Sequence, residues 1–168
     1  MEDTMKTKII EKLFGLAYTD SLTELPNRTA YEEHLKKLRK ERAVLDNITV
    51  IAVDIDDLKF VNEMYGYHTG DEALRIVANN LKRILGDVAD IYRIGSDNFI
   101  CIANKEVLSY VAQFMDFMSF ENRDRYFKVN VSVGYALFNP KKHKSIDDLI
   151  KTCDVKMYQD KKRKNKMR

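Results

Sequence analysis

Three closely spaced carboxylates are the residues with the clearest chemical potential in this chain. Asp54, Asp56 and Asp57 follow the apolar run 48–53, and Ile55 is the only apolar residue among them. A short, continuous, β-branched run of this kind indicates a buried strand. Acids at the end of such a strand, followed by a loop and a helix, could hold a metal ion and phosphate groups. The alternative interpretation is a solvated strand end, where the acids face only water.

The segment after these acids is polar and rich in turn-forming residues. The side chains that stand out in it are Lys59, Asn62, Gly66, Gly70 and Asp71. Apolar residues then recur at helical spacing from Leu74 to Leu85, and Gly86 follows the last of them. We therefore expect a turn-rich polar connection and then a helix that ends at Leu85.

Other patterns predict the elements that must position these groups. They are a helix capped by Asn27 or Thr29, strands at 90–94 and 99–103 joined by the turn 95–98, a helix at 107–118, a strand at 126–138, and a helix capped by Ser145 with Asp148. From residue 48 onward the order is β-α-β-β-α-β plus a terminal helix. This is the ferredoxin-like order of an α+β fold, an α/β sandwich. We expect a mostly antiparallel sheet with helices on one face.

This topology would bring two acids from distant parts of the chain together. Asp54, at the end of the first strand, could face Asp97, in the turn of the hairpin. Two carboxylates about 5 Å apart repel each other by roughly 3 kcal/mol at an effective dielectric constant of 20. A divalent cation would reverse this penalty, because it prefers hard oxygen ligands.

The composition is typical of a single globular domain, with 168 residues of which 45% are hydrophobic and 33% are charged. No apolar run approaches the roughly 18 residues that a membrane helix needs, and the charged N-terminal residues exclude a signal-peptide core. Cys101 and Cys153 lie within apolar patterns. We predict buried thiols, a reducing compartment and a cytoplasmic location.

The C-terminal end is strongly basic, because six of the residues 161–168 are cations. Such an end could contact nucleic acid or phosphate. However, no aromatic residues interleave with the cations, as a stacking platform for single strands would require. Nucleic acid is therefore not an expected partner, and we interpret the end as a solvated, frayed terminus.

Five motifs in register resemble those of the GGDEF family, the diguanylate cyclases that join two GTP molecules into cyclic di-GMP. The resemblance covers residues 18–165. The matching segments are 20–28 (D-x-L-T-x-L-x-N-R), 54–62 (D-I-D-x-F-K-x-I-N), 66–71 (G-H-x-x-G-D, with Tyr67 in place of histidine), 132–134 (S-x-G) and 153–161 (A-D-x-A-L-Y-x-A-K). The resemblance implies a nucleotidyl cyclase-like palm and GTP as the nucleotide.

The resemblance also implies which residues bind the metal ion and which bind phosphate. Asp54 and Asp97, together with the carbonyl of Ile55, would hold Mg²⁺ or Mn²⁺. Lys59 and Lys161 would bind triphosphate oxygens as point charges. Asp54, Asp97 and Lys59 would then be the catalytic residues.

The nucleotide itself would be recognised by a second group of residues. By the resemblance, Asn62 and Asp71 would read the guanine edge, and Gly95 and Ser96 would contact the nucleotide. The residues alone leave another interpretation open, in which Asn62 and Asp71 form a pair that stabilises the loop.

The signature motif departs from the family pattern. The family has Gly-Gly-(Asp or Glu)-Glu-Phe, whereas this chain has Gly95-Ser96-Asp97-Asn98-Phe99. Asp97 retains the third position. Ser96 would strain a turn that needs positive φ, at a cost of roughly 1–2 kcal/mol. Asn98 removes a negative charge beside the cations, so we expect impaired catalysis.

Two further departures concern regulation and phosphate binding. Residues 86–89 stand where the family has an R-x-x-D product-inhibition site, so we expect that site to be absent. The terminal G-R-N of the family is replaced by Lys164-Asn165, which leaves Arg163 or Lys164 as substitutes for the missing phosphate contact.

Three functions follow as hypotheses. They are a degenerate GGDEF domain that binds GTP or a partner, a working diguanylate cyclase, and a structural interaction module without nucleotide. The expected organisation is a linker or signalling helix at 1–18, a GGDEF domain at 19–165 and a basic tail at 166–168. An active enzyme would be a homodimer, and an upstream sensor domain or a partner protein could regulate it.

Overall fold

The structure, a computed structural model, describes residues 5, 15, 17–123 and 125–166. Its elements in chain order are α2 (Arg28–Lys40), the 3₁₀ helix η1 (Arg42–Asn47), β1 (Thr49–Ile55), α3 (Leu58–Tyr65), α4 (Tyr67–Leu85), β2 (Asp90–Arg93), β3 (Asn98–Ala103), α5 (Leu108–Glu121), β4 (Val131–Leu137) and α6 (Ile146–Lys166). Most of the helix predicted at 1–18 lies outside the described residues. None of the described helices is long and apolar enough to cross a membrane.

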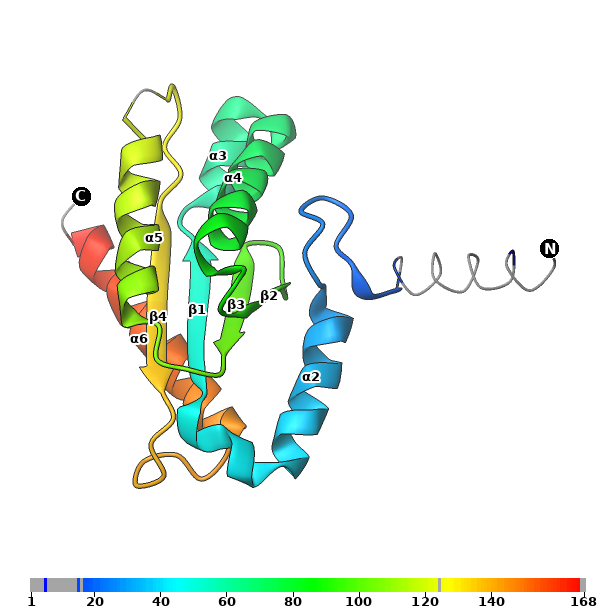
Figure 1. Cartoon of the computed structure of the whole chain (residues 1–168). Helices are drawn as coiled ribbons and strands as arrows, with labels where there is room; N and C mark the ends of the chain where they lie inside the picture. Colours follow the sequence, from blue (N-terminus) through cyan, green and yellow to red (C-terminus); the bar gives the residue numbers. More distant parts are fainter. Residues whose placement is uncertain (1–4, 6–14, 16, 124, 167–168) are drawn as a thin grey trace.

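In the described part of the chain, β1 is a central strand of a four-stranded sheet with the order β2-β3-β1-β4 (Figure 1). Every pairing in it is antiparallel. Val53 of β1 lies between Phe99 of β3 and Val133 of β4. The α+β class and the ferredoxin-like order are therefore confirmed. This pairing places the end of β1 beside both the β2–β3 turn and the start of β4.

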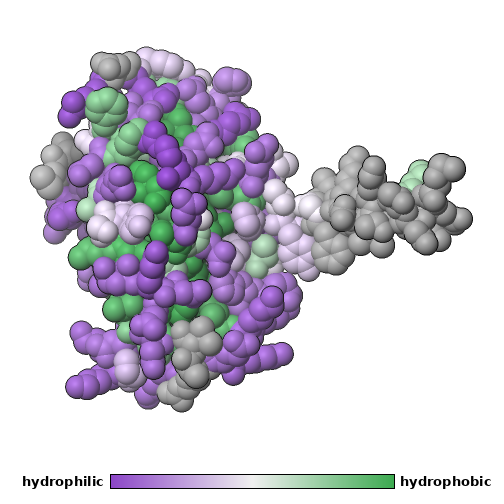
Figure 2. Space-filling model, in the orientation of Figure 1, coloured by the Kyte–Doolittle hydropathy of each residue, from purple (hydrophilic) through white to green (hydrophobic). Residues whose placement is uncertain are grey.

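Helices cover both faces of the sheet, so the prediction of helices on one face is wrong. Ile51 and Val53 belong to the core that includes α4 and α5, whereas Val50 and Ala52 belong to the core that includes α2 and α6. In Figure 1, α4 and α5 lie in front of the sheet and α6 lies behind it. Figure 2 shows hydrophobic side chains gathered over the middle of the front face, bordered by hydrophilic ones. All seven residues of β1 are buried because both of its faces are covered.

Three predicted segments differ from the structure. The polar connection after the acids is largely helical, because α3 fills it and ends where Gly66 adopts a φ of +87°. The last strand begins at Val131 and not at residue 126, although Phe127 and Val129 are buried ahead of it. The basic end is not frayed through residue 166, because α6 continues to Lys166.

Other predicted features are confirmed. Asn27 caps α2 by accepting a hydrogen bond from the Ala30 N–H at 3.2 Å. Ser145 accepts one from the Asp148 N–H at 3.3 Å before α6 begins. Both cysteines are free and buried.

Helix α6 packs unusually close to β4 because Gly134 has no side chain. A Cβ atom at Gly134 would lie 2.0 Å from the carbonyl oxygen of Cys153 and 2.3 Å from the backbone nitrogen of Met157. On the same helix, the Cys153 thiol donates a hydrogen bond to the carbonyl of Val50 in β1 at 3.2 Å. The glycine of the S-x-G motif therefore sets the distance between α6 and the sheet.

We expect Gly134→Ala to lower the free energy of unfolding by about 1–3 kcal/mol, because the added methyl group would displace a helix backbone. Urea denaturation followed by circular dichroism measures this effect. Gly95→Ala is the matched control, since its Cβ would lie no closer than 3.5 Å to any atom beyond its two chain neighbours. The control should change stability by less than about 0.5 kcal/mol, and equal losses in both variants would contradict this explanation.

Candidate functional site

Carboxylates from the end of β1 and from the β2–β3 turn lie at the same end of the sheet. Asp54 and Asp56 are only 8% and 4% exposed. Asp54 pairs with Asn98, the first residue of β3, and the Ile55 N–H donates a hydrogen bond to the carbonyl of Asp97 at 3.0 Å. The structure therefore brings Asp54, Ile55 and Asp97 to the same end of adjacent strands.

Lys161 supplies the positive charge at this end of the sheet. Its amine lies 2.5 Å from Oδ1 of Asp54. The geometry follows from the packing of α6 along β1. From Cys153 to Lys161 the helix rises about 12 Å, and from Val50 to Asp54 the strand rises about 13 Å. Because Cys153 touches Val50, Lys161 reaches Asp54.

The charges at this site are mutually dependent. Burial raises the pKa of Asp54 above its ordinary value of 3.8, the charges of Asp97 and Asp56 raise it further, and Lys161 opposes them. Burial alone would lower the pKa of Lys161, but the hydrogen bond and charge of Asp54 outweigh burial and raise it. The site thus contains more negative charge than the partly buried Lys161 balances.

Asp56 occupies a buried position that the sequence analysis did not interpret. Its Oδ1 accepts a hydrogen bond from the Ser132 hydroxyl at 2.6 Å, and its N–H donates to the carbonyl of Asn130 at 2.8 Å. Its Oδ2 is buried and has no hydrogen-bond partner among the described residues. Ser132 of the S-x-G motif therefore joins β4 to the end of β1, and the motif's serine was the available signal.

Arg93 connects the opening motif to the signature turn, and the sequence analysis did not identify it. Its guanidinium donates to both carboxylate oxygens of Asp20, at 3.0 and 3.2 Å. It also donates to the carbonyls of Gly95 and Ser96, at 3.2 and 2.8 Å. Burial alone would raise the pKa of Asp20, but hydrogen bonds from Thr23 and the charge of Arg93 hold that pKa below its ordinary value.

The signature turn accommodates its serine without backbone strain, so the prediction of a strained Ser96 is wrong. Among the described non-glycine residues, positive φ occurs at Glu24 and Asp57 only. The Ser96 hydroxyl donates to Oδ1 of Asp97 at 2.9 Å, and the Asn98 amide donates to the same oxygen at 2.7 Å. Both departures from the family signature therefore act on Asp97.

The residues expected to bind guanine lie together at the junction of α3 and α4. A Cβ atom at Gly70 would lie 1.8 Å from Oδ1 of Asn62, so the Asn62 amide rests directly on the glycine backbone. Asp71 follows Gly70 in α4 and is half-buried.

The remaining expected phosphate ligands lie away from Asp54 in this structure. Lys59 is 90% exposed and lies 3.7 Å from Glu63. Lys164 donates to the carbonyl of Val131 at 2.5 Å, and Arg163 pairs with Asp160 at 2.7 Å. Lys161 is therefore the cation that the fold places on the acids.

The donor set at the end of β1 suits a hard divalent cation. It offers the carboxylates of Asp54 and Asp97 and the carbonyl of Ile55, with the unpaired Oδ2 of Asp56 nearby in the chain. All of these donors are oxygen atoms, which Mg²⁺ and Mn²⁺ prefer. Within the described residues, no three His, Cys, Asp or Glu side chains form a ready metal cluster. A cation here would need the carbonyl, solvent or a nucleotide to complete its coordination.

Comparison with known proteins agrees with this arrangement. The model of the family described as "Diguanylate cyclase, GGDEF domain" matches residues 17–167. The chain therefore belongs to the GGDEF family, and it is a GGDEF domain of cyclic di-GMP signalling.

Individual relatives show how much of a longer protein this chain matches. It is 31% identical to the signalling protein YkoW of Bacillus subtilis, over 95% of this chain and 21% of that protein. It is 30% identical to the diguanylate cyclase DgcP of Escherichia coli, over 92% of this chain and 47% of that protein. The chain thus spans between about a fifth and a half of these relatives.

A solved structure of similar fold is the coiled coil and GGDEF domain of DgcB from Caulobacter crescentus, in complex with c-di-GMP. It superposes with a TM-score of 0.84 at 25% identity, covering 96% of this chain and 89% of that chain.

We expect Asp54→Asn to make the ligand-free protein more stable at neutral pH. The raised pKa of Asp54 means that folding disfavours its charged form. The resulting destabilisation is present above that raised pKa and disappears as the pH falls below 3.8. The stability difference between the variant and the native chain should therefore shrink on acidification, as measured by thermal unfolding between pH 7 and pH 3.5.

The same variant should lose any rise in melting temperature that Mg²⁺ produces in the native chain. Asp147→Asn is the control, because its pKa is lowered by Arg39 and its removal should destabilise the protein at neutral pH. A destabilised Asp54→Asn variant would contradict the conclusion that folding disfavours the buried charge of Asp54.

Proposed function

We propose that this chain is a GTP-binding GGDEF domain, with Mg²⁺ or Mn²⁺ as its cofactor, whose cyclase activity is weak or absent. It would serve as a regulatory nucleotide-binding or interaction module. The observation that carries the proposal is the environment of Asp97. Its carboxylate is retained beside Asp54, but Ser96 and Asn98 both donate to its Oδ1. These donors occupy the lone pairs of Oδ1, which leaves only the other carboxylate oxygen of Asp97 for a cation.

The cation would be held by Asp54, Asp97 and the carbonyl of Ile55. When bound, it supplies positive charge that neutralises phosphate oxygens and favours ionisation of the attacking hydroxyl. In this structure Lys161 occupies Oδ1 of Asp54. We infer that Lys161 turns from the carboxylate toward the triphosphate when a nucleotide and cation enter.

The triphosphate would receive a second positive charge from Lys59. This residue lies in the first turn of α3, one element beyond the acids, and its side chain is free to move because it is 90% exposed. A flexible ammonium group can follow phosphate oxygens as a point charge.

Guanine would be bound at the α3–α4 junction. The amide of Asn62 and the carboxylate of Asp71 together match the donors and acceptors of the guanine edge. Gly70 permits this arrangement, since any side chain there would displace Asn62. A carboxylate that accepts from the base N–H groups favours GTP over ATP.

Weak catalysis follows from Asn98. In the cyclase reaction, the 3′-hydroxyl of one GTP attacks the α-phosphorus of a second, and pyrophosphate leaves. Negative protein charge is needed to hold the cation against the developing charges, and Asn98 presents a neutral amide where the family has a carboxylate. The loss of one preorganised electrostatic contact lowers a rate by about 10²–10³.

The second candidate function is a working diguanylate cyclase. The unstrained Ser96 and the Arg93 contacts that hold the turn favour it. Each domain binds one GTP in this reaction, so activity would require a homodimer that brings two sites together.

The wider context is also proposed. The buried, free Cys101 and Cys153 support a reducing, cytoplasmic location. Because the chain spans only part of its relatives, a sensor domain or a partner protein could supply the signal. The N-terminal segment 1–18 would be the linker.

Product formation tests the proposal directly. With GTP and either Mg²⁺ or Mn²⁺ at high protein concentration, we expect the native chain to form cyclic di-GMP about 10²–10³ times more slowly than Ser96→Gly/Asn98→Glu. Chromatography measures the product. Because Ser96 is unstrained, Asn98→Glu alone should recover most of the gain. Asp97→Ala controls for contaminating activity, and native turnover within tenfold of the restored variant would support the working cyclase instead.

Nucleotide recognition is tested separately by calorimetric binding of GTP and ATP with Mg²⁺. We expect Asp71→Asn to weaken GTP binding by about 10–100-fold, since a hydrogen bond to a charged group contributes about 1.5–3 kcal/mol, and to leave ATP binding unchanged. Asp87→Asn, an exposed acid beyond the end of α4, is the matched control. Equal binding of GTP by native chain and Asp71→Asn would overturn the assignment of Asp71.

A further inference from the structure

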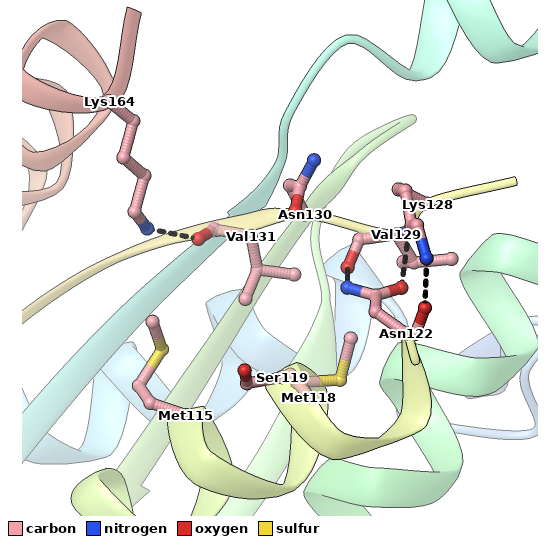
Figure 3. A pocket seen from close by; sticks show the side chains of 9 residues that line it. All are labelled: Met115, Met118, Ser119, Asn122, Lys128, Val129, Asn130, Val131 and Lys164. Atoms are coloured by element: carbon pink, nitrogen blue, oxygen red, sulfur yellow. Dashed lines mark hydrogen bonds between the residues drawn. The ribbon is translucent and has the colours of Figure 1, made fainter. Parts of the chain in front are cut away.

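Two adjoining cavities follow the outer edge of β4. One, of about 420 Å³, lies between the end of α5 and residues 128–131 (Figure 3). The other, of about 410 Å³, lies against Val133 and Tyr135. Met115 of α5 lines both cavities. Together they form one feature, which we call the β4 groove.

The floor of the β4 groove is apolar and incompletely covered. Val133, Tyr135 and Met115 pack against the front core, yet each remains only partly buried. β4 is an edge strand of the sheet. Helix α5 contributes Met115 to the groove but leaves Val133 and Tyr135 only partly covered.

The rim of the groove is strongly basic. Lys128, Lys156, Arg163 and Lys164 line the two cavities, and Asp160 is the one acid among the lining residues. Arg163 is 72% exposed, and the Lys156 amine lies 5.6 Å from the centre of the Tyr135 ring. An apolar floor with a cationic rim complements a ligand that is apolar on one side and acidic at its borders.

The free edge of β4 is already hydrogen-bonded by side chains of α6. The amines of Lys156 and Lys164 donate to the carbonyls of Tyr135 and Val131, at 2.9 and 2.5 Å. Asp160 accepts from the Val133 N–H at 3.1 Å. Four residues of helix rise about 6 Å, which matches the roughly 6.6 Å between alternate strand residues, so the three side chains follow the edge in step.

This edge arrangement restricts what can bind in the groove. A strand that joined β4 would need the backbone groups that α6 has taken, so an occupant must bind through its side chains. Lys156 uses one N–H on a carbonyl and keeps the others for carboxylates. Lys164 uses one N–H on a carbonyl and a second on Asp160, which leaves it a single donor. The floor from Val131 to Tyr135 is about 13 Å long, which is the length of about nine helical residues.

We propose that the β4 groove binds an acidic amphipathic helix of a partner protein. The apolar stripe of that helix would lie on Met115, Val133 and Tyr135, and its flanking carboxylates would face Lys156 and Arg163. Helix α6 carries three of the four cations of the rim and also Lys161. An occupant would therefore contact the helix whose lysine pairs with Asp54. The proposal does not depend on nucleotide binding.

A synthetic probe tests the groove. It is a fluorescein-labelled peptide of 18 residues with Leu at helical i, i+3, i+4 and i+7 positions and Glu on its flanks, and fluorescence anisotropy measures its affinity. We expect Lys156→Glu/Arg163→Glu to weaken binding at least about tenfold, because two facing charges are reversed. Lys141→Glu/Lys142→Glu makes the same change in net charge on an exposed loop outside the groove, and it should bind within twofold of the native chain.

Amide chemical shifts in isotopically labelled protein locate the probe. We expect the peptide to shift resonances in β4 and in α5 from Val111 to Met118. A scrambled peptide of the same composition should bind at least about tenfold more weakly, since it lacks the apolar stripe. Equal affinity of the two double variants, equal affinity of the scrambled peptide, shifts confined to other elements, or no binding below 1 mM (about −4 kcal/mol) would each overturn the proposal.

Discussion

The ion pair between Asp54 and Lys161 is the interaction on which this domain's site depends. A carboxylate at the end of a fully buried strand is costly unless a positive charge lies beside it. Lys161 supplies that charge from the other end of the sequence. It can do so only because α6 runs along β1 and β4 in close contact, with Cys153 against Val50 and Gly134 bare beneath the helix. The ion pair of the site therefore depends on the close packing of α6 against the sheet.

Several residues shape the site through contacts with other parts of the chain. Ser132 donates to the buried Asp56 and so joins β4 to the end of β1. Arg93 holds the signature turn through two carbonyls and fastens it to Asp20 of the opening motif. Gly70 has no side chain, which leaves space for the amide of Asn62. A buried polar group without a partner is costly, and in this site Asp56 has a partner at Oδ1 only.

The signature turn has an unstrained backbone, and its two departures from the family motif change the hydrogen bonds at Asp97. Ser96 costs no backbone strain here, so its effect and that of Asn98 are electrostatic. Both turn their donors onto Oδ1 of Asp97. They leave the fold of the turn intact while reducing the negative charge available to a cation. In the proposed function, this separation of structure from charge lets the domain bind a nucleotide while its catalysis is weak.

The sequence by itself determined the four strands, most of the helices, their order and the strand that carries the acids. The apolar run before Asp54, the cap at Asn27 and the polar hairpin turn 95–98 are local signals, and local signals follow from backbone geometry and side-chain periodicity. The motif resemblance also identified Asp54, Asp97, Asn62 and Asp71 as candidate site residues from the sequence alone.

Only the tertiary structure decided what these residues touch. It placed helices on both faces of the sheet, made α3 from a polar segment that read as a loop, and directed Lys161 inward while leaving Lys59 in solvent. It also revealed the Arg93 and Ser132 contacts, which join residues far apart in sequence. Such contacts depend on how the strands pair and how closely the helices approach the sheet. The pattern of residues within one segment does not show which distant segment will lie beside it.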